Sequence, residues 1–255
     1  MSDYNKWNTA ARGGYAGQTA AVDAGLRAYM LRVYNYMAAA VALTGVVAWL
    51  CFQNAVVTNE AGAITGLTSF GQMILGGYTP IVLMLATLGL VFFISFRINT
   101  LQYTTALGLF MLYAALLGAA LTSIFVAYTG ASVARVFFIS AASFGALSLY
   151  GYTTQRDLSA MGSFLIMGLF GIIIASLVNI FLASSMLQFV VSVVGVLVFA
   201  GLTAWDTQRL KNEYIYGYAG EGDVAERSAI MGALSLYLNF INLFTLLLQL
   251  LGQRD

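Results

Sequence analysis

Residues 188–211 read QFVVSVVGVLVFAGLTAWDTQRLK, and this stretch decides the class of fold. It is almost wholly apolar up to Ala204 and then turns polar at Asp206. On a helix Asp206 shares one face with Gly195, Phe199 and Thr203, because residues three and four apart lie on the same side. An ionisable group in an apolar span normally faces a bundle interior or a water-filled cavity. Asp206 is therefore predicted to mark a functional site.

The composition of the whole chain agrees with a membrane protein. Of 255 residues, 60% are hydrophobic and only 8% are charged, with a mean hydropathy of +0.85, whereas soluble proteins carry about 25% charged residues. The net charge is +1 and no basic run is present, which argues against a nucleic-acid partner.

The residue types also argue against most enzyme classes. Cys51 is the single cysteine and histidine is absent, which excludes an intrachain disulfide and most zinc sites and hydrolase triads. The sequence contains no phosphate-binding loop, no H-E-x-x-H and no G-x-S-x-G motif. We therefore expect no enzymatic activity and no resident cofactor.

The apolar segments predict an all-α protein with seven transmembrane helices. They lie at about 33–52, 79–96, 104–128, 132–149, 161–183, 188–204 and 228–251, each near the ~20 residues that a helical span needs. Residues 1–32 are interpreted as a polar cytosolic arm, 33–252 as the transmembrane domain and 253–255 as a short tail. Residues 212–227 are predicted to form a loop. The seventh segment is the most polar, and a re-entrant hairpin is its alternative interpretation.

Basic residues predict the orientation of the chain. If the segments alternate, only Arg135 and Arg254 fall on the side opposite the amino terminus. Because cytosolic segments carry the excess of Lys and Arg, the amino terminus is predicted to be cytosolic. The same count puts Asp206 toward the cytosolic end of the sixth span.

The seventh segment carries a polar stripe at helical spacing, formed by Ser235, Asn239, Asn242 and Gln249. Amide side chains in hydrocarbon need hydrogen-bond partners, so this stripe should face other helices or a polar path. The alternative is that Asn239 and Asn242 only hold helices together.

Several motifs together resemble the Bax inhibitor-1 (YccA-like) membrane family. They are GLTAWDTQRLK at 201–211, ALSLYLNFINLF at 233–244, FGALSLYG at 144–151, TQRDLS at 154–159 and NIF at 179–181. The resemblance covers about residues 31–252, and the extended polar arm looks like that of bacterial members. It implies a seven-helix fold whose last helix is wrapped by the other six. It also implies a multi-pass protein of the bacterial inner membrane that acts as a pH-sensitive calcium leak channel.

The resemblance further implies a pair of aspartates near the cytosolic mouth and an arginine that helps to hold the closed form. Asp206 matches the first aspartate, but the second position is Asn239 here, and Arg97 is a loose match for the arginine. Two nearby carboxylates share a proton and titrate together, whereas a carboxylate facing an amide does not. We therefore expect weaker or acid-shifted pH gating than in a two-aspartate relative.

A weak, transient calcium site is predicted from oxygen ligands. Asp206, the Asn239 and Asn242 carbonyl oxygens, the Thr203 hydroxyl and water would supply them, and weak binding suits conduction.

The competing interpretation is that Asp206 forms an ion pair with Arg97, Arg209 or Lys211 at the membrane interface, since an acidic side chain costs much less free energy there than at the centre of the bilayer.

Two other functions stay open at this point. The chain could be a regulatory interaction protein that modulates a membrane protease or a stress or cell-death response through the arm and residues 212–227. It could also be a cation antiporter. The lipid bilayer is the expected surrounding in each case.

Overall fold

The computed structural model describes residues 3–59, 64–218 and 222–254, with side chains from residue 23 onward except at 218 and 223. Residues 1–2 of the predicted arm, its side chains up to 22 and residue 255 of the tail lie outside this description. Within it the elements are α1 (Asp3–Ala55), β1 (Val56–Thr58), β2 (Ile64–Leu67), α2 (Ser69–Leu75), α3 (Thr79–Arg97), α4 (Tyr103–Ala120), α5 (Thr122–Ala127), α6 (Gly130–Thr153), α7 (Ser159–Leu182), α8 (Ser185–Glu213), the π-helical turn η1 (Tyr214–Tyr218) and α9 (Gly222–Leu251).

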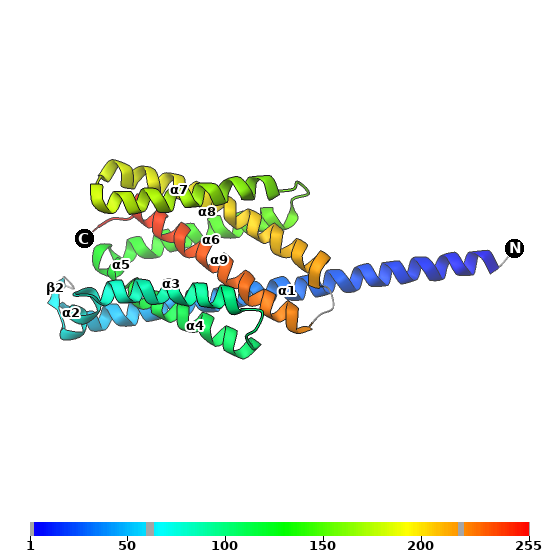
Figure 1. Ribbon diagram of the computed structural model, residues 1–255, viewed down its shortest axis with the longest axis horizontal. Coiled ribbons are helices and arrows are strands. Elements are labelled where there is room, and N and C mark those ends of the chain that lie inside the picture. Colours follow the sequence, from blue (N-terminus) through cyan, green and yellow to red (C-terminus); the bar gives the residue numbers. More distant parts are fainter. Residues whose placement is uncertain (1–2, 60–63, 219–221, 255) are drawn as a thin grey trace.

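The described residues form an all-α bundle with seven helices long and apolar enough to cross a membrane (Figure 1). These candidate spans are 23–55, 79–97, 103–127, 130–153, 159–182, 185–217 and 224–251. The seven-helix prediction is thereby confirmed. The connection between the first two spans contains the two-stranded antiparallel hairpin β1–β2, in which Val56 pairs with Leu67.

The first span begins earlier than the sequence predicts. Helix α1 is continuous, and Leu26, Tyr29, Met30 and Val33 are all buried in the bundle. These four residues follow the three- and four-residue spacing of one helical face. Arg27 and Arg32 lie between them and interrupt the apolar run, which is why the hydropathy pattern alone puts the boundary at Val33.

Helix α9 is the most buried span and packs against α1, α4, α6 and α8. Half of the residues in its most apolar window are buried, compared with 6% in α7. Helix α3 packs mainly on α4, and α7 mainly on α8. The predicted enclosure of the last helix by all six others is therefore not confirmed. Because α9 is one uninterrupted helix, the re-entrant hairpin is wrong.

Small residues allow the helices to approach closely. A Cβ added at Gly118 of α4 would lie 2.6 Å from the Thr44 carbonyl oxygen of α1, and one at Gly151 of α6 would lie 2.1 Å from that of Ala204 in α8. Such glycine contacts are typical of helix packing in membranes. The Gly151 contact fixes α8, and with it Asp206, against α6.

The predicted loop at 212–227 is wrong for its described residues. Helix α8 continues to Glu213, η1 follows, and α9 starts at Gly222. Tyr214 stacks on Tyr29 of α1 with ring centroids 5.0 Å apart, and Glu226 forms a 3.1 Å salt bridge with Arg32. These contacts explain why polar residues here are helical.

Candidate ion site between the last two spans

The Asp206 carboxylate is buried between α8 and α9, with only 4% of the residue exposed. Its Oδ2 atom accepts hydrogen bonds from the Ser235 hydroxyl at 2.8 Å and from the Asn239 side-chain amide at 2.7 Å. A buried carboxylate is costly unless it is paired and hydrogen-bonded. The predicted meeting of Asp206 with the amide stripe is therefore present in the structure.

The other carboxylate oxygen faces a cation. Asp206 Oδ1 lies 2.9 Å from Arg209 Nη2, and Arg209 Nε lies 3.5 Å from a Glu213 carboxylate oxygen. The Arg209 guanidinium also covers the Trp205 ring, 4.8 Å from its centroid. No aligned hydrogen bond reaches Oδ1 from any described residue. This oxygen is paired by charge alone, and the group of two acids and one arginine has a formal net charge of −1.

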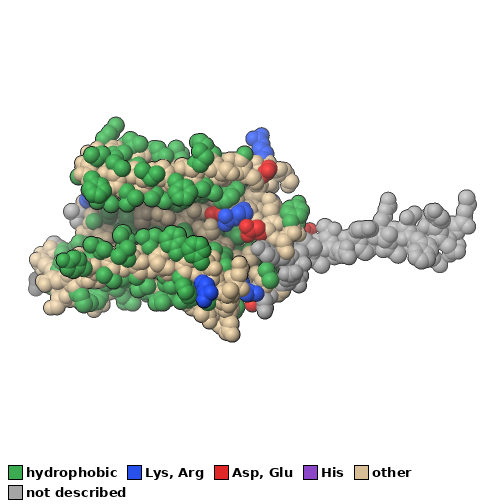
Figure 2. Space-filling model, viewed as in Figure 1, with side chains coloured by type: hydrophobic (Ala, Val, Ile, Leu, Met, Phe, Trp, Pro, Cys, Tyr) green, Lys and Arg blue, Asp and Glu red, His purple; other side chains and the backbone are tan. Residues whose placement is uncertain are grey.

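A groove of about 630 Å³ leads from this cluster along the bundle between α7, α8 and α9. Asp206, Arg209, Asn239 and Asn242 line it, and α7 contributes mainly aliphatic side chains. A second hollow of about 410 Å³ shares Arg209 with the groove and reaches α3. On the face drawn in Figure 2, a hollow runs between two bands of hydrophobic side chains, with basic and acidic side chains gathered at one end.

The remaining predicted ligands do not contact the carboxylate through any described hydrogen bond. The Thr203 hydroxyl donates to the Phe199 carbonyl oxygen at 2.8 Å within α8. The Asn242 amide donates to the Leu238 carbonyl oxygen at 2.8 Å within α9. Asn242 still lines the groove, whereas Thr203 is fully buried.

Of the three cations predicted to pair with Asp206, only Arg209 does so. Lys211 Nζ donates to the Tyr152 carbonyl oxygen at 2.7 Å. Arg97 is exposed in the last turn of α3, and no ion pair joins it to another described residue. Arg209 is therefore the structural candidate for a closing ion pair.

A second polar cluster lies near the opposite end of the α8–α9 contact. Gln249 Oε1 accepts hydrogen bonds from Gln188 Nε2 at 2.6 Å and from the Ser192 hydroxyl at 2.9 Å. Leu246 separates this cluster from the groove, because its Cδ1 atom lies 2.6 Å from where a Cβ on Gly195 would be. The polar stripe thus has a charged end, a neutral end and an apolar barrier between them.

Gln208 performs a structural task that sequence reasoning missed. Its Oε1 accepts the Leu158 backbone N–H at 2.8 Å, and its Nε2 donates to the Arg156 carbonyl oxygen at 2.7 Å. Both partners lie in the turn between α6 and α7, within the TQRDLS motif. The spacing of residues on α8 does not show which segment lies opposite Gln208. The only sequence signal for this contact was that the GLTAWDTQRLK and TQRDLS motifs occur in the same chain.

The arrangement suits a weakly bound cation better than a tightly held metal. Among the described residues, no three His, Cys, Asp or Glu side chains gather to hold a metal ion. One carboxylate with neighbouring amide and hydroxyl groups falls short of the six to eight oxygens of a tight calcium site.

The fold and this site define a multi-pass helical membrane protein with a buried carboxylate at one end of a lateral groove. The model of the family described as inhibitor of apoptosis-promoting Bax1 (Bax1-I) matches residues 26–255, and the chain belongs to this family. The resemblance in the motifs is thereby confirmed.

Three relatives extend over nearly the whole chain. Protein RP147 of Rickettsia prowazekii (strain Madrid E) is 46% identical over 100% of this chain and 99% of its own length. Inner membrane protein YbhL of Escherichia coli (strain K12) is 45% identical over 91% of this chain and 94% of its own. Membrane protein SpyM3_0260 of Streptococcus pyogenes serotype M3 (strain MGAS315) is 36% identical over 91% and 96%.

Proposed function

We propose that this chain is a calcium leak channel in which Asp206 forms the cation-attracting mouth. One observation carries the proposal, the burial of a carboxylate between α8 and α9 at the end of a largely apolar groove that Asn239 and Asn242 line on its α9 side. Intramembrane acids are expensive and typically mark ion pathways. A role in an ion pathway would account for the presence of this acid inside the bundle.

The proposed route follows the groove from Asp206 past Asn239 and Asn242 toward Gln249. Conduction requires sites that attract an ion without holding it. A single carboxylate with amide oxygens nearby fits that requirement. Calcium is a transient passenger in this proposal, with no resident cofactor and no catalytic activity.

The ion pair between Asp206 and Arg209 is the proposed closing contact. It occupies the carboxylate oxygen that has no other aligned partner, so a cation can bind there only when Arg209 moves away. Arg209 is 37% exposed in its side chain and lies in both hollows. It therefore has space to move toward either one.

The proposed location is a bacterial inner membrane, in keeping with the name of the relative YbhL. We place the amino terminus and Asp206 on the cytosolic side, because Arg156, Arg209 and Lys211 gather at that end while Arg135 and Arg254 lie toward the other.

The test is calcium flux into liposomes containing the purified protein and a calcium-sensitive dye. Asp206→Asn should lower the flux about fivefold or more although it also removes the pair with Arg209, since the attraction of one charge in a partly dry site is worth ~1 to ~4 kcal/mol.

Asp157→Asn is the matched control. Asp157 is an exposed acid at the same end, and hydrogen bonds from Ser159 hold the pKa of its carboxyl below the usual range. Both variants thus replace a carboxylate by an amide, but only Asp206 lies in the groove. Equal flux through wild type, Asp206→Asn and protein-free liposomes would rule out the leak. Flux that requires an opposing proton or sodium gradient would instead identify an antiporter.

A further inference from the structure

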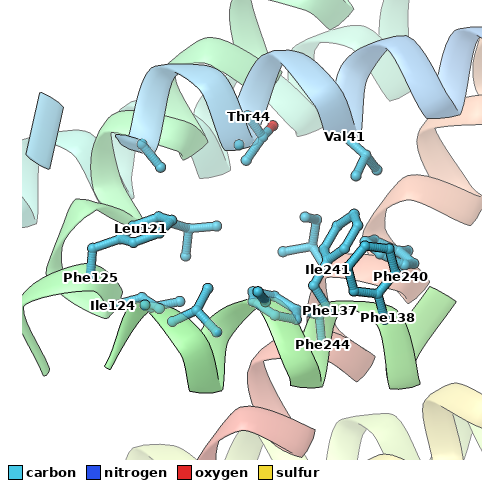
Figure 3. A pocket seen from close by; sticks show the side chains of 15 residues that line it. Val41, Thr44, Leu121, Ile124, Phe125, Phe137, Phe138, Phe240, Ile241 and Phe244 are labelled. Atoms are coloured by element: carbon cyan, nitrogen blue, oxygen red, sulfur yellow. The ribbon is translucent and has the colours of Figure 1, made fainter. Parts of the chain in front are cut away.

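An apolar cavity of about 310 Å³ lies apart from the ion groove, between α1, α5, α6 and α9 (Figure 3). The rings of Phe125, Phe137, Phe240 and Phe244 and the side chains of Leu121 and Ile124 surround it. The break between α4 and α5 at Leu121 forms part of its wall.

The cavity offers almost nothing to a polar ligand. Thr44 is the only side chain with a polar group in its lining. Its hydroxyl already lies 2.9 Å from the carbonyl oxygens of Ala40 and Ala114 and 2.7 Å from the Tyr237 hydroxyl. A buried water needs two to four polar partners, so water is a poor occupant.

The cavity is continuous with the surface that faces hydrocarbon. Its lining belongs to candidate spans, and Phe138 at its edge is 71% exposed. A Cβ added at Gly45 or Gly130 would meet nothing within 4 Å, so the glycines leave an opening. An apolar space in contact with hydrocarbon is filled by it, because unfilled space forfeits dispersion contacts.

A cation lies beside this opening. Arg135 follows the lining residue Ala134 on α6 and precedes Phe138 by three positions. Because residues three apart lie on the same side of a helix, Arg135 lies on the side of α6 where Phe138 borders the cavity. Arg135 is exposed, and no ion pair joins it to another described residue. From Gly130 to Phe138 the cavity wall follows α6 for about 12 Å. Arg135 lies within this stretch, and a long arginine side chain can extend along the helix to the headgroup level.

We propose that this cavity binds one acyl chain of a membrane phospholipid whose phosphate is held by Arg135. The aromatic and aliphatic wall recognises the hydrocarbon chain, and the guanidinium recognises the anionic headgroup. The occupant lies in the leaflet opposite the Asp206 end, since Arg135 and Arg254 lie at the other end of the bundle. This site is independent of ion conduction.

The test uses the full chain in liposomes containing phosphatidylglycerol with a photoactivatable diazirine in its acyl chain. Crosslinked peptides are mapped by mass spectrometry. Wild type should concentrate crosslinks on 133–138 and 240–244. Gly45→Phe fills the opening and should lower them about tenfold, the equivalent of ~1.4 kcal/mol.

Gly171→Phe provides the matched control, since a Cβ there also meets nothing within 4 Å but the residue lies on α7 outside the cavity. It should leave the crosslinks at 133–138 unchanged. Ala134→Phe, at the cavity edge, replaces Gly45→Phe if that variant does not fold. Crosslinks spread evenly over all spans, or unchanged by both filling variants, would overturn the site.

A second probe tests the headgroup contact. Arg135→Gln should lower crosslinking by the phosphatidylglycerol probe but not by a diacylglycerol probe that carries the same chain without phosphate. Equal responses to both probes would overturn the role of Arg135.

Discussion

Replacing Asn239 by aspartate should add a second titratable group to the contact with Asp206. In the wild type the Asn239 amide donates to Asp206 Oδ2 at 2.7 Å, and an amide donates at any pH. An aspartate at this position can donate only while it carries a proton. The Asn239→Asp variant should therefore hold one proton between two carboxylates and lose it as the pH rises.

The size of the effect follows from the separation of the two groups. Two negative charges ~4 Å apart repel by about 4 kcal/mol at the effective dielectric near a protein surface, and by about 1 kcal/mol in water. Since the groove is open on one side, the effect lies between these limits. Dividing this repulsion energy by 1.36 kcal/mol per pH unit predicts that the midpoint of the flux profile lies ~1 to ~3 pH units higher than that of an isolated carboxylate.

The assay is the pH profile of calcium flux through liposomes containing wild type, Asn239→Asp or Asn242→Asp. Asn242 lies three residues further along the same groove, but its amide bonds within α9 and not to Asp206. The control adds the same charge without creating the pair, so its profile should lack the new midpoint. Identical profiles for wild type and Asn239→Asp would refute the reasoning.

Three further variants test the packing and the route. Gly151→Val should lower the free energy of unfolding by about 2 kcal/mol or more through overpacking, because its Cβ would lie 2.1 Å from the α8 backbone. Gly171→Val has open space and should not; thermal unfolding in detergent compares the two. Gln208→Ala removes two hydrogen bonds to the α6–α7 turn and should cost about 2 kcal/mol, with faster hydrogen exchange in that turn. Normal protection there would contradict this role. Leu246→Ser should raise calcium flux by removing the apolar barrier over Gly195; unchanged flux would show that Leu246 is no barrier.

The sequence predicted the features that depend on helical periodicity. Seven apolar segments predicted the seven candidate spans. The spacing on the sixth and seventh segments predicted the helical faces that carry Asp206 and Asn239, and these two side chains are hydrogen-bonded in the structure. Both predictions rest on local geometry, because an amphipathic face records which side of a helix is buried.

Features that depend on the partner surface were beyond the sequence. Arg97, Arg209 and Lys211 were equivalent candidates by charge. Arg209 pairs with Asp206 within α8, three residues apart, whereas the contact of Lys211 with the Tyr152 carbonyl oxygen depends on the neighbouring helix α6. The same applies to Gln208, whose partners are backbone groups without a sequence signature. The helical residues after Asn212 were missed because their contacts with α1 are made by Tyr214 and Glu226, which look like loop residues when read alone.

The unequal ends of the α8–α9 contact have an electrical consequence. Within the contact itself, one end holds two acids, Asp206 and Glu213, with one cation, Arg209, and the other holds the uncharged group of Gln188, Ser192 and Gln249. In the proposed channel, fixed negative charge at one end of this contact would enrich cations there relative to the other end. Currents recorded across a planar bilayer should therefore rectify, passing more cations from the Asp206 side than toward it at equal and opposite voltages.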